Sequence, residues 1–357
     1  MSTTVSSRKA LRNQKLKTLG ITVITGMLIG GLFTPVAFGM DTARLIKGLT
    51  AGFIITLTIG ILELFIFTRN FKKIRFSLAL VFRTLCYVAA ISVSVILVWV
   101  IHESSVNNAG VIQTIKSEDF RHFIYEGDFK KILLFTVVAG FIINFFTQIN
   151  SLLGKNVLFN YLTGKYHYPL NEERVFMFVD LSSSTAIAER LDPVTYHKFI
   201  NNYYFDIDES IVECKGEVYQ YVGDEVVISW RGSKGFENVN CIKCFFKIKS
   251  EIERLSEKYL ETFGIVPEFK AGLHCGNVVT GEIGDSKREI AFHGDVLNTA
   301  SRILSQCSIL DKRLLVSEDV KNNIHPCKEF VFENMGKFKL KGKEKEMELF
   351  SVEELKS

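Results

Sequence analysis

Four long apolar runs fill the first 150 residues and constrain the fold of this chain more than any other feature. They cover about residues 19–39, 48–67, 78–101 and 132–149. Each run approaches the ~20 residues that a helix needs to cross the hydrocarbon core of a bilayer. We interpret the first run as a membrane helix rather than a leader, because no small-residue cleavage site ends it and further runs follow. The pattern therefore predicts an all-α membrane domain over residues 1–150, with four transmembrane helices.

The charges beside these runs predict how the helices are oriented. The N-terminal tail and the link between the second and third runs are rich in Lys and Arg, whereas the link from His102 to Lys131 carries mixed charges. Cytoplasmic loops of membrane proteins hold the excess of basic residues. We therefore expect a multi-pass protein of the cell inner (plasma) membrane, with both termini in the cytoplasm. The basic residues are Arg8, Lys9, Arg12, Lys15 and Lys17 in the tail, and Arg69, Lys72, Lys73 and Arg75 in the link.

Two ionisable residues, Glu63 and Arg83, fall inside the apolar runs. Both lie about six to eight residues from the same cytoplasmic link, so a rise of ~1.5 Å per residue puts them at similar depth. Ionisable groups within a membrane usually pair with one another or face the interior of the helix bundle. The sequence favours a Glu63–Arg83 pair, and separate snorkelling of the two side chains to the interface is the alternative.

A connector follows the fourth run, over residues 151–170. Its apolar residues recur with a helical period, and Gly164 and Pro169 end the pattern. An apolar stripe on a connecting helix favours a dimer contact, and a plain tether is the alternative. The stripe consists of Leu152, Leu153, Val157, Leu158, Tyr161 and Leu162.

The rest of the chain, residues 171–357, alternates strand and helix signals. RVFMFVDL predicts a buried strand, SSSTAIAERL predicts a helix start, and EVYQYVGDEVVISW predicts a hairpin that turns at Gly-Asp. A long helix to about Phe263, two strands in EFKAGLHCGNVVTGEIG and a helix in VLNTASRILSQ follow. No Rossmann glycine fingerprint interrupts the series, so we expect an α/β sandwich with helices over one mixed sheet.

Charge and cysteine content exclude two classes of protein. The net charge is only +4, and no stripe of Lys and Arg alternates with aromatic residues, so we expect no nucleic-acid partner. The seven cysteines are odd in number and irregularly spaced, which argues against a disulfide framework. We interpret the pair Cys241 and Cys244 as two small apolar residues on one helix face rather than as metal ligands.

Two carboxylates stand at strand ends in this half. Asp180 ends the first predicted strand, and Asp224 sits at the tip of the hairpin. If the two strands are neighbours, both side chains project from one edge of the sheet. Paired carboxylates suit Mg²⁺, which takes its remaining ligands from water and substrate phosphates. The helix start over Ser183, Ser184 and Thr185 offers N–H groups to phosphate oxygens, and we expect Leu181 beside Asp180 in the metal site.

Further candidates lie in FHGDVLNTASRI and in the lysine-rich segment GKFKLKGKEKEMELF. Asn298 and Arg302 are four residues apart and share one helix face. Asn can orient a ribose oxygen, and Arg can stabilise charge on a phosphate in transfer. Lys341, just before Gly342, can reach terminal phosphates, although a solvated lysine-rich hairpin gives the same pattern.

The motifs FVDLSSST, YVGDE, HGDVLNTASRI and LKGK, in this order, make residues from about Arg174 to Glu353 resemble the class III nucleotidyl cyclase catalytic domain. The resemblance implies an α+β fold with a ferredoxin-like core, working as a head-to-tail homodimer with active sites at the interface. It implies that Asp180 and Asp224 hold two Mg²⁺ or Mn²⁺ ions, that Asn298 orients the ribose, that Arg302 stabilises the transition state and that Lys341 binds the terminal phosphates. The membrane half resembles that of membrane-anchored bacterial cyclases, which respond to a signal that this sequence does not identify.

Two positions depart from the adenylyl members of that family. Gln220 stands four residues before Asp224, where those members have an adenine-reading Lys, and Ala291 stands seven residues before Asn298, where an Asp or Thr is usual. Gln220 is at an even offset from Asp224, so we expect its amide to face the base. The resemblance implies ATP as the substrate. A cyclase for guanine or pyrimidine nucleotides, or an inactive nucleotide-binding receptor, is the alternative.

Overall fold

The computed structural model describes residues 19–20, 23–35, 39, 42–67, 74–154, 156–325 and 328–355. These residues form two compact units, which divide the chain between Leu152 and Leu153. The basic N-terminal tail, the link residues Arg69, Lys72 and Lys73, and Cys327 lie outside the described residues.

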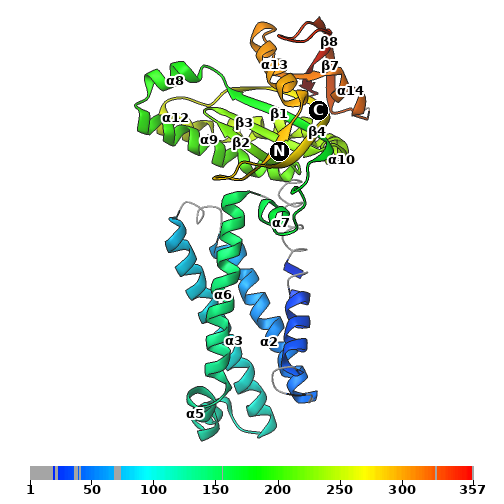
Figure 1. Cartoon of the computed structure of the whole chain (residues 1–357). Helices are drawn as coiled ribbons and strands as arrows, with labels where there is room; N and C mark the ends of the chain where they lie inside the picture. The colour runs from blue at the N-terminus through cyan, green and yellow to red at the C-terminus, as the bar shows by residue number, and fades with distance from the viewer. Residues whose placement is uncertain are drawn as a thin grey trace. The chain divides into compact units, whose positions relative to one another are not determined.

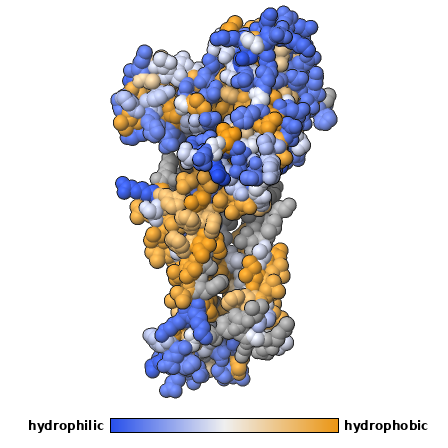
Figure 2. All heavy atoms as spheres, viewed as in Figure 1, coloured by the Kyte–Doolittle hydropathy of each residue, from blue (hydrophilic) through white to orange (hydrophobic). Residues whose placement is uncertain are grey.

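The first unit is entirely helical. Two of its described helical segments are long and apolar enough to cross a membrane, Phe76–Val106 and Glu118–Leu153, and two shorter apolar helices cover Val23–Pro35 and Leu45–Ile61. Figure 2 shows apolar side chains over the outside of this unit, with hydrophilic residues gathered around the short helix α5 (Glu118–Tyr125). The helices are α2 (Thr42–Ile61), continued by the π-helix Leu62–Ile66, and α3 (Phe76–Val106), α4 (Val111–Lys116), α5 (Glu118–Tyr125) and α6 (Asp128–Leu153).

Glycines bring the helix Val23–Pro35 and α2 into close backbone contact. A Cβ on Gly30 would lie 2.2 Å from the carbonyl oxygen of Gly48, and one on Gly52 would lie 2.3 Å from that of Gly26. The two helices thus pair a G-x-x-x-G segment with another, as close-packed membrane helices do.

The charged residues of the apolar runs lie in one aromatic cluster. Glu63 accepts a hydrogen bond from the hydroxyl of Tyr87, and the guanidinium of Arg83 lies 4.9 Å from the ring centre of Phe67. Phe67 in turn packs edge-on against Tyr87, with ring centres 5.6 Å apart. The Glu63–Arg83 pair therefore stays a prediction, and the structure adds Tyr87 as a partner of Glu63.

The second unit is built on one mixed sheet of eight strands in the order β2-β3-β1-β4-β6-β8-β7, with β5 paired to β4. The β4–β6 pair is parallel, and the other pairs are antiparallel. The strands are β1 (Leu170–Leu181), β2 (Glu217–Val222), β3 (Glu225–Arg231), β4 (Phe269–Ile283), β5 (Glu289–His293), β6 (Leu314–Ser317), β7 (Phe330–Phe338) and β8 (Met347–Glu354).

The first four strands confirm the predicted ferredoxin-like core, because β4-β1-β3-β2 is its strand order. Successive side chains of β1 point to opposite faces of the sheet, so each face packs against its own layer of helices. Val175, Met177 and Val179 point into the main core, where they pack against the buried faces of α9 (Pro193–Glu213) and α11 (Asn240–Arg254). Cys241 and Cys244 are fully buried in this core, which confirms their interpretation as apolar residues. The helices are α7 (Val157–Leu162), α8 (Ser184–Arg190), α9 (Pro193–Glu213), α10 (Gly232–Phe236), α11 (Asn240–Arg254), α12 (Ser256–Phe263), α13 (Asp295–Ile309) and α14 (Glu318–Asn323).

Helix α13 covers the opposite face of the sheet (Figure 1). There Phe176 and Phe178 pack with Val296, Ala300 and Leu304. Helix α13 comes so close to β4 that a Cβ on Gly272 would lie 2.3 Å from the backbone nitrogen of Leu304. Glycine at 272 is therefore what allows the second layer to form here.

Local predictions differ from the structure in two places. The two strands predicted in EFKAGLHCGNVVTGEIG form one continuous strand, β4, because it pairs with β1 over their shared length in spite of its glycines. The long helix predicted to Phe263 divides at Leu255 into α11 and α12.

Candidate active site

Asp180 lies at the end of β1, on the sheet face that α13 covers. Its place follows from the alternation that puts Phe176 and Phe178 on that face. In the sheet register, Asp180 is opposite Glu225 of β3 and Lys270 of β4. Lys270 Nζ lies 3.7 Å from Asp180 Oδ2 and donates to Ser308 Oγ at 2.6 Å. Asp180 therefore has a carboxylate on one side and an ammonium group on the other.

Asp224 occupies the two-residue turn between β2 and β3, next to Gly223. Gly223 has a φ of +64°, which a glycine at the first turn position adopts without strain. The hydroxyl of Tyr204, on α9, lies 2.9 Å from the carbonyl oxygen of Gly223 and 3.2 Å from that of Glu225. Tyr204 thus holds the backbone on both sides of Asp224.

The structure brings Asp180, Asp224 and Glu225 into one acidic cluster. Burial, the charge of Asp224 and a hydrogen bond with it raise the pKa of Asp180 to about 6, although Lys270 opposes this shift. Burial and the charges of Asp180 and Asp224 raise the pKa of Glu225 to about 7. Carboxylates that oppose one another's ionisation in this way are stabilised by a cation placed between them.

A divalent cation fits the pair Asp180 and Asp224. Among the described residues, no group of three or more His, Cys, Asp or Glu side chains forms a metal cage by itself. Mg²⁺ does not need such a cage, because it commonly binds one or two carboxylates, several waters and substrate phosphates. The side chain of Leu181 is buried in the core, so only its backbone carbonyl is left as a ligand.

The predicted phosphate-binding helix start is present but short. Ser183 has a left-handed backbone with a φ of 56° and precedes α8, in which Ser184 and Thr185 are the first residues. The backbone N–H of Ser182 already donates a hydrogen bond to the carbonyl oxygen of Glu268, at 2.8 Å. Phosphate binding by Ser183, Ser184 and Thr185 stays a prediction.

Asn298 and Arg302 lie on α13, away from its buried face. Val296, Thr299, Ala300, Ile303 and the rest of the apolar stripe face the sheet, while Asn298 is exposed and Arg302 is half-buried. The predicted i, i+4 pair therefore lies on a helix face that is open to a ligand.

The loop that carries Lys341 packs against the same helix. A Cβ on Gly342, where φ is +71°, would lie 3.4 Å from a terminal nitrogen of Arg302. Lys343 forms an ion pair with Asp295 at the start of α13. The structure thus brings the LKGK motif to Arg302, which the spacing of the lysines alone did not establish.

Gln220 follows Tyr219 in the sequence, and Ala291 precedes Phe292. These two aromatic residues pack against each other. Gln220 is opposite Val227, which belongs to the layer beneath α13, so it shares the sheet face of Asp180. The even offset between Gln220 and Asp224 does not by itself place them on one face, because β2 ends at Val222 and Asp224 lies in the turn. The neighbouring rings, Tyr219 and Phe292, lie 4.8 Å apart.

One chain keeps its acidic cluster apart from Asn298. Through Lys270, Asp180 is tied to Ser308 near the C-terminal end of α13. Asn298 lies ten residues earlier on α13, which is about 15 Å at 1.5 Å per residue. The candidate residues of one protomer fall into two groups: the acidic half-site, which is Asp180 and Asp224, and the α13 half-site, which is Asn298, Arg302 and Lys341.

The sequence pattern did not predict that Tyr204, Glu225 and Lys270 belong to the candidate active site. Glu225 adjoins a predicted metal ligand, so a search for further carboxylates would have found it. Tyr204 belongs to a distant helix and Lys270 to another strand, and only the fold brings them to the cluster.

A mixed sheet with a ferredoxin-like core, and an acidic pair on one edge of it, define the class III cyclase architecture. Residues 168–354 match the family described as adenylate and guanylate cyclase catalytic domain. The chain belongs to this family. This confirms the resemblance and the α+β fold that the sequence predicted.

Named relatives agree with the family. Adenylate cyclase 2 of Rhizobium meliloti (strain 1021) is 31% identical over 221 residues, which are 62% of this chain and 61% of that relative. The membrane guanylyl cyclase of Dictyostelium discoideum is 29% identical over 177 residues, 47% of this chain and 10% of that relative. The chain thus spans about three fifths of the first relative and far less of the second.

A solved bacterial light-regulated adenylyl cyclase shares the fold. It superposes with a TM-score of 0.53 at 22% identity, over 62% of this chain and 63% of that one.

Proposed function

We propose that the protein is a membrane-anchored adenylate cyclase that converts ATP to 3′,5′-cyclic AMP and pyrophosphate. The pairing of Asp180 with Asp224 carries this proposal, because cyclisation needs charge stabilisation where the phosphate reacts. The relatives named adenylate cyclase support the same reaction.

Asp180 and Asp224, with the backbone carbonyl of Leu181, are the residues that would hold Mg²⁺ or Mn²⁺. Two such ions would activate the 3′-hydroxyl and neutralise charge on the α-phosphate. Asn298 would hold the ribose so that its 3′-oxygen faces the phosphorus. Arg302 would donate to the phosphate oxygens as charge develops, and Lys341 would bind the terminal phosphates that leave as pyrophosphate.

We propose that two copies of the chain form each active site. Lys270, which is paired with Asp180, contacts α13 at Ser308. Asn298 lies about 15 Å from Ser308 along this helix, which favours this arrangement over a site within one protomer. A head-to-tail dimer would join the acidic half-site of one protomer to the α13 half-site of its partner. Two equivalent sites would result.

Gln220 favours a second substrate, GTP, beside ATP. An amide both donates and accepts, so by rotating it can satisfy either the adenine 6-amino group or the guanine 6-carbonyl. Ala291, with its methyl side chain, supplies no second polar contact. Discrimination between the two bases should accordingly be modest.

The test of the reaction is an assay of the purified chain with Mg²⁺ or Mn²⁺ and each nucleoside triphosphate in turn, with products identified by mass. We expect cyclic AMP as the main product. Absence of any cyclic nucleotide under both metals would contradict the proposal.

We further propose that residues 1–150 form the membrane domain and that residues 151–170 connect it to the catalytic domain over residues 171–357. The apolar helices α3 and α6 support membrane placement. A tag inserted near Asn107 should react with an impermeant reagent on intact cells, and a reporter after Ser357 should not. Protection of the Asn107 tag would contradict the four-helix topology.

A further inference from the structure

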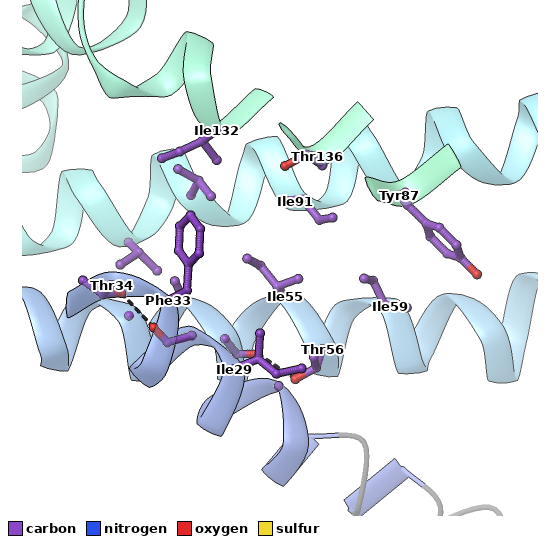
Figure 3. Close-up of a pocket in the computed structure, with 18 of the residues that line it drawn as sticks. Ile29, Phe33, Thr34, Ile55, Thr56, Ile59, Tyr87, Ile91, Ile132 and Thr136 are labelled. Carbon is purple, nitrogen blue, oxygen red and sulfur yellow. Dashed lines mark hydrogen bonds between the residues drawn. The ribbon is translucent and has the colours of Figure 1, made fainter. Parts of the chain in front are cut away.

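The helical unit contains an elongated, partly open cavity of about 900 Å³. Its wall comes from the helix Val23–Pro35 and from α2, α3 and α6, with Phe123 of α5 at one end. Figure 3 shows Ile55 and Ile59 of α2 facing Ile91 of α3 across the space, with Ile132 and Thr136 of α6 above them. Along α2 and the π-helix that continues it, the lining extends from Lys47 to Glu63, which is about 24 Å at 1.5 Å per residue.

A cavity of this volume favours an occupant. Protein interiors hold few voids larger than a water molecule, and the cost of an apolar void grows with its volume. Water is a poor occupant, because a buried water needs two to four polar partners. An apolar molecule is therefore the fitting occupant.

The middle of the cavity wall is less polar than its sequence suggests. The hydroxyls of Thr34, Thr56 and Thr147 donate to carbonyl oxygens one turn back in their own helices, at 2.7, 2.6 and 2.8 Å. Figure 3 shows the first two of these bonds. These threonines thus present mainly methyl groups to the cavity.

Both ends of the cavity are polar, with Lys47 at one end and the Glu63–Tyr87 pair at the other. Lys47 Nζ lies 3.2 Å from Glu103 Oε1, and His102 Nδ1 lies 3.6 Å from the same oxygen. An ammonium group has three donors, so Lys47 can bind an acceptor oxygen in addition to Glu103. The remaining donors of Lys47, which lines the cavity, make this end suited to the carboxylate of an anionic head group.

One acyl chain fits within the length of the cavity. A bilayer core is about 30 Å thick, so each leaflet's chains span about 15 Å. A chain of that length with its head at Lys47 ends before Glu63, whose carboxylate is held by Tyr87. A helix of a second copy is too large, because a helix about 10 Å across and 24 Å long occupies roughly twice the cavity volume.

We propose that this cavity is a binding site for a free long-chain fatty acid, with the carboxylate at Lys47 and the chain between α2, α3 and α6. The helical unit is then a receptor for a single-chain anionic amphiphile. The inference concerns residues 23–147 alone and does not depend on the activity of the catalytic domain.

Gly140 gives a variant that fills the cavity without disturbing the helices. It lines the space, and a Cβ there would meet nothing within 4 Å. Alanine, leucine and phenylalanine at 140 should fill the cavity step by step while improving helix propensity. Val138→Phe is the matched control, since Val138 is half exposed on the same helix and is not part of the lining.

The experiment uses the full chain in phosphatidylcholine vesicles with a photoreactive diazirine analogue of palmitic acid. We expect cross-links on lining residues such as Ile55 and Ile91, removed by excess palmitic acid. Labelling should fall stepwise from Gly140→Ala to Gly140→Phe, at least fivefold overall, and stay unchanged in Val138→Phe.

The head group is tested by competition. Lys47→Met should raise the palmitic acid concentration for half-competition about tenfold, as expected for loss of a charged hydrogen bond, and should leave competition by hexadecanol unchanged. Equal labelling of lining and lipid-facing residues, insensitivity to all Gly140 variants, or labelling of the lining by a photoreactive phosphatidylcholine that palmitic acid cannot displace would overturn the proposal.

Discussion

The hydroxyl of Tyr204 lies 2.9 Å from the carbonyl oxygen of Gly223, the residue before Asp224. It also lies 3.2 Å from the carbonyl oxygen of Glu225, the residue after Asp224. Burial raises the pKa of Tyr204 well above its usual value, so the hydroxyl keeps its proton and remains a donor. A side chain on α9 thereby positions a candidate metal ligand on the hairpin.

Tyr204→Phe should lower the turnover number about three- to tenfold, since a hydrogen bond of this kind contributes about 1 kcal/mol. The Mg²⁺ concentration for half-maximal activity should rise as well, because the hairpin carries Asp224. The control is Tyr221→Phe, which keeps the ring that packs 4.4 Å from Tyr204. A metal dependence identical to that of the parent protein would show that Tyr204 does not position Asp224.

Gln220→Lys should sharpen the preference for ATP over GTP. A lysine only donates, so it matches the ring nitrogen N1 of adenine, which is an acceptor, and cannot pair with the N1–H of guanine, which is a donor. The amide of Gln220 adapts to both bases. The measurement is the ratio of kcat/KM for the two nucleotides, which should rise about tenfold or more. If the parent protein does not turn over GTP, or if this ratio is unchanged, Gln220 is not the base reader.

His274 should make the catalytic domain less stable in mild acid. It is buried, and Nδ1 lies 2.8 Å from Ser317 Oγ, the N-cap of α14. Burial lowers the pKa of His274 to about 4 in spite of the nearby Asp319 carboxylate. The unfolded chain binds a proton near pH 6.5 and the folded one near pH 4, so stability is lost as pH falls through this window.

Between pH 7 and pH 5 His274 alone contributes a loss of about 2 kcal/mol in the free energy of unfolding. Asp180 and Glu225 contribute with the opposite sign, because their raised pKa values favour the folded state as pH falls, so the loss is taken as the difference between the parent protein and His274→Gln. Denaturant titration with Trp230 fluorescence, in a Trp99→Phe background, measures it. His274→Gln should reduce the loss, because the amide can still accept from Ser317 without titrating. An equal pH dependence in the variant would show that another group is responsible.

The catalytic fold was largely predictable from its sequence, because strand alternation and helix caps are local signals. Asp192, for example, caps α9 by accepting from Val194 and Thr195, as the start of PVTYHKF indicates. The acidic pair was predictable because both residues stand at element ends. The contact of Gly342 with Arg302 was not, since it depends on how the loop after β7 packs on α13.

In the helical unit, the apolar runs predicted where the helices lie in the sequence. They did not predict how the helices pack against one another. Neither the Tyr87–Glu63 contact nor the cavity could be read from hydropathy, because both depend on how the helices pack. The short helices α4 and α5 were not predicted either, because they lie in the link of mixed charge between His102 and Lys131.

The central claim is that each active site joins Asp180 of one protomer to Arg302 of another. Asp180→Ala and Arg302→Ala chains should each be inactive, with losses of 10³-fold or more for the metal ligand. Co-expressed with different affinity tags and purified as the mixed dimer, they should recover cyclic AMP synthesis, since one of the two composite sites is then intact. A purified mixed dimer with no more activity than either variant alone would contradict the shared site.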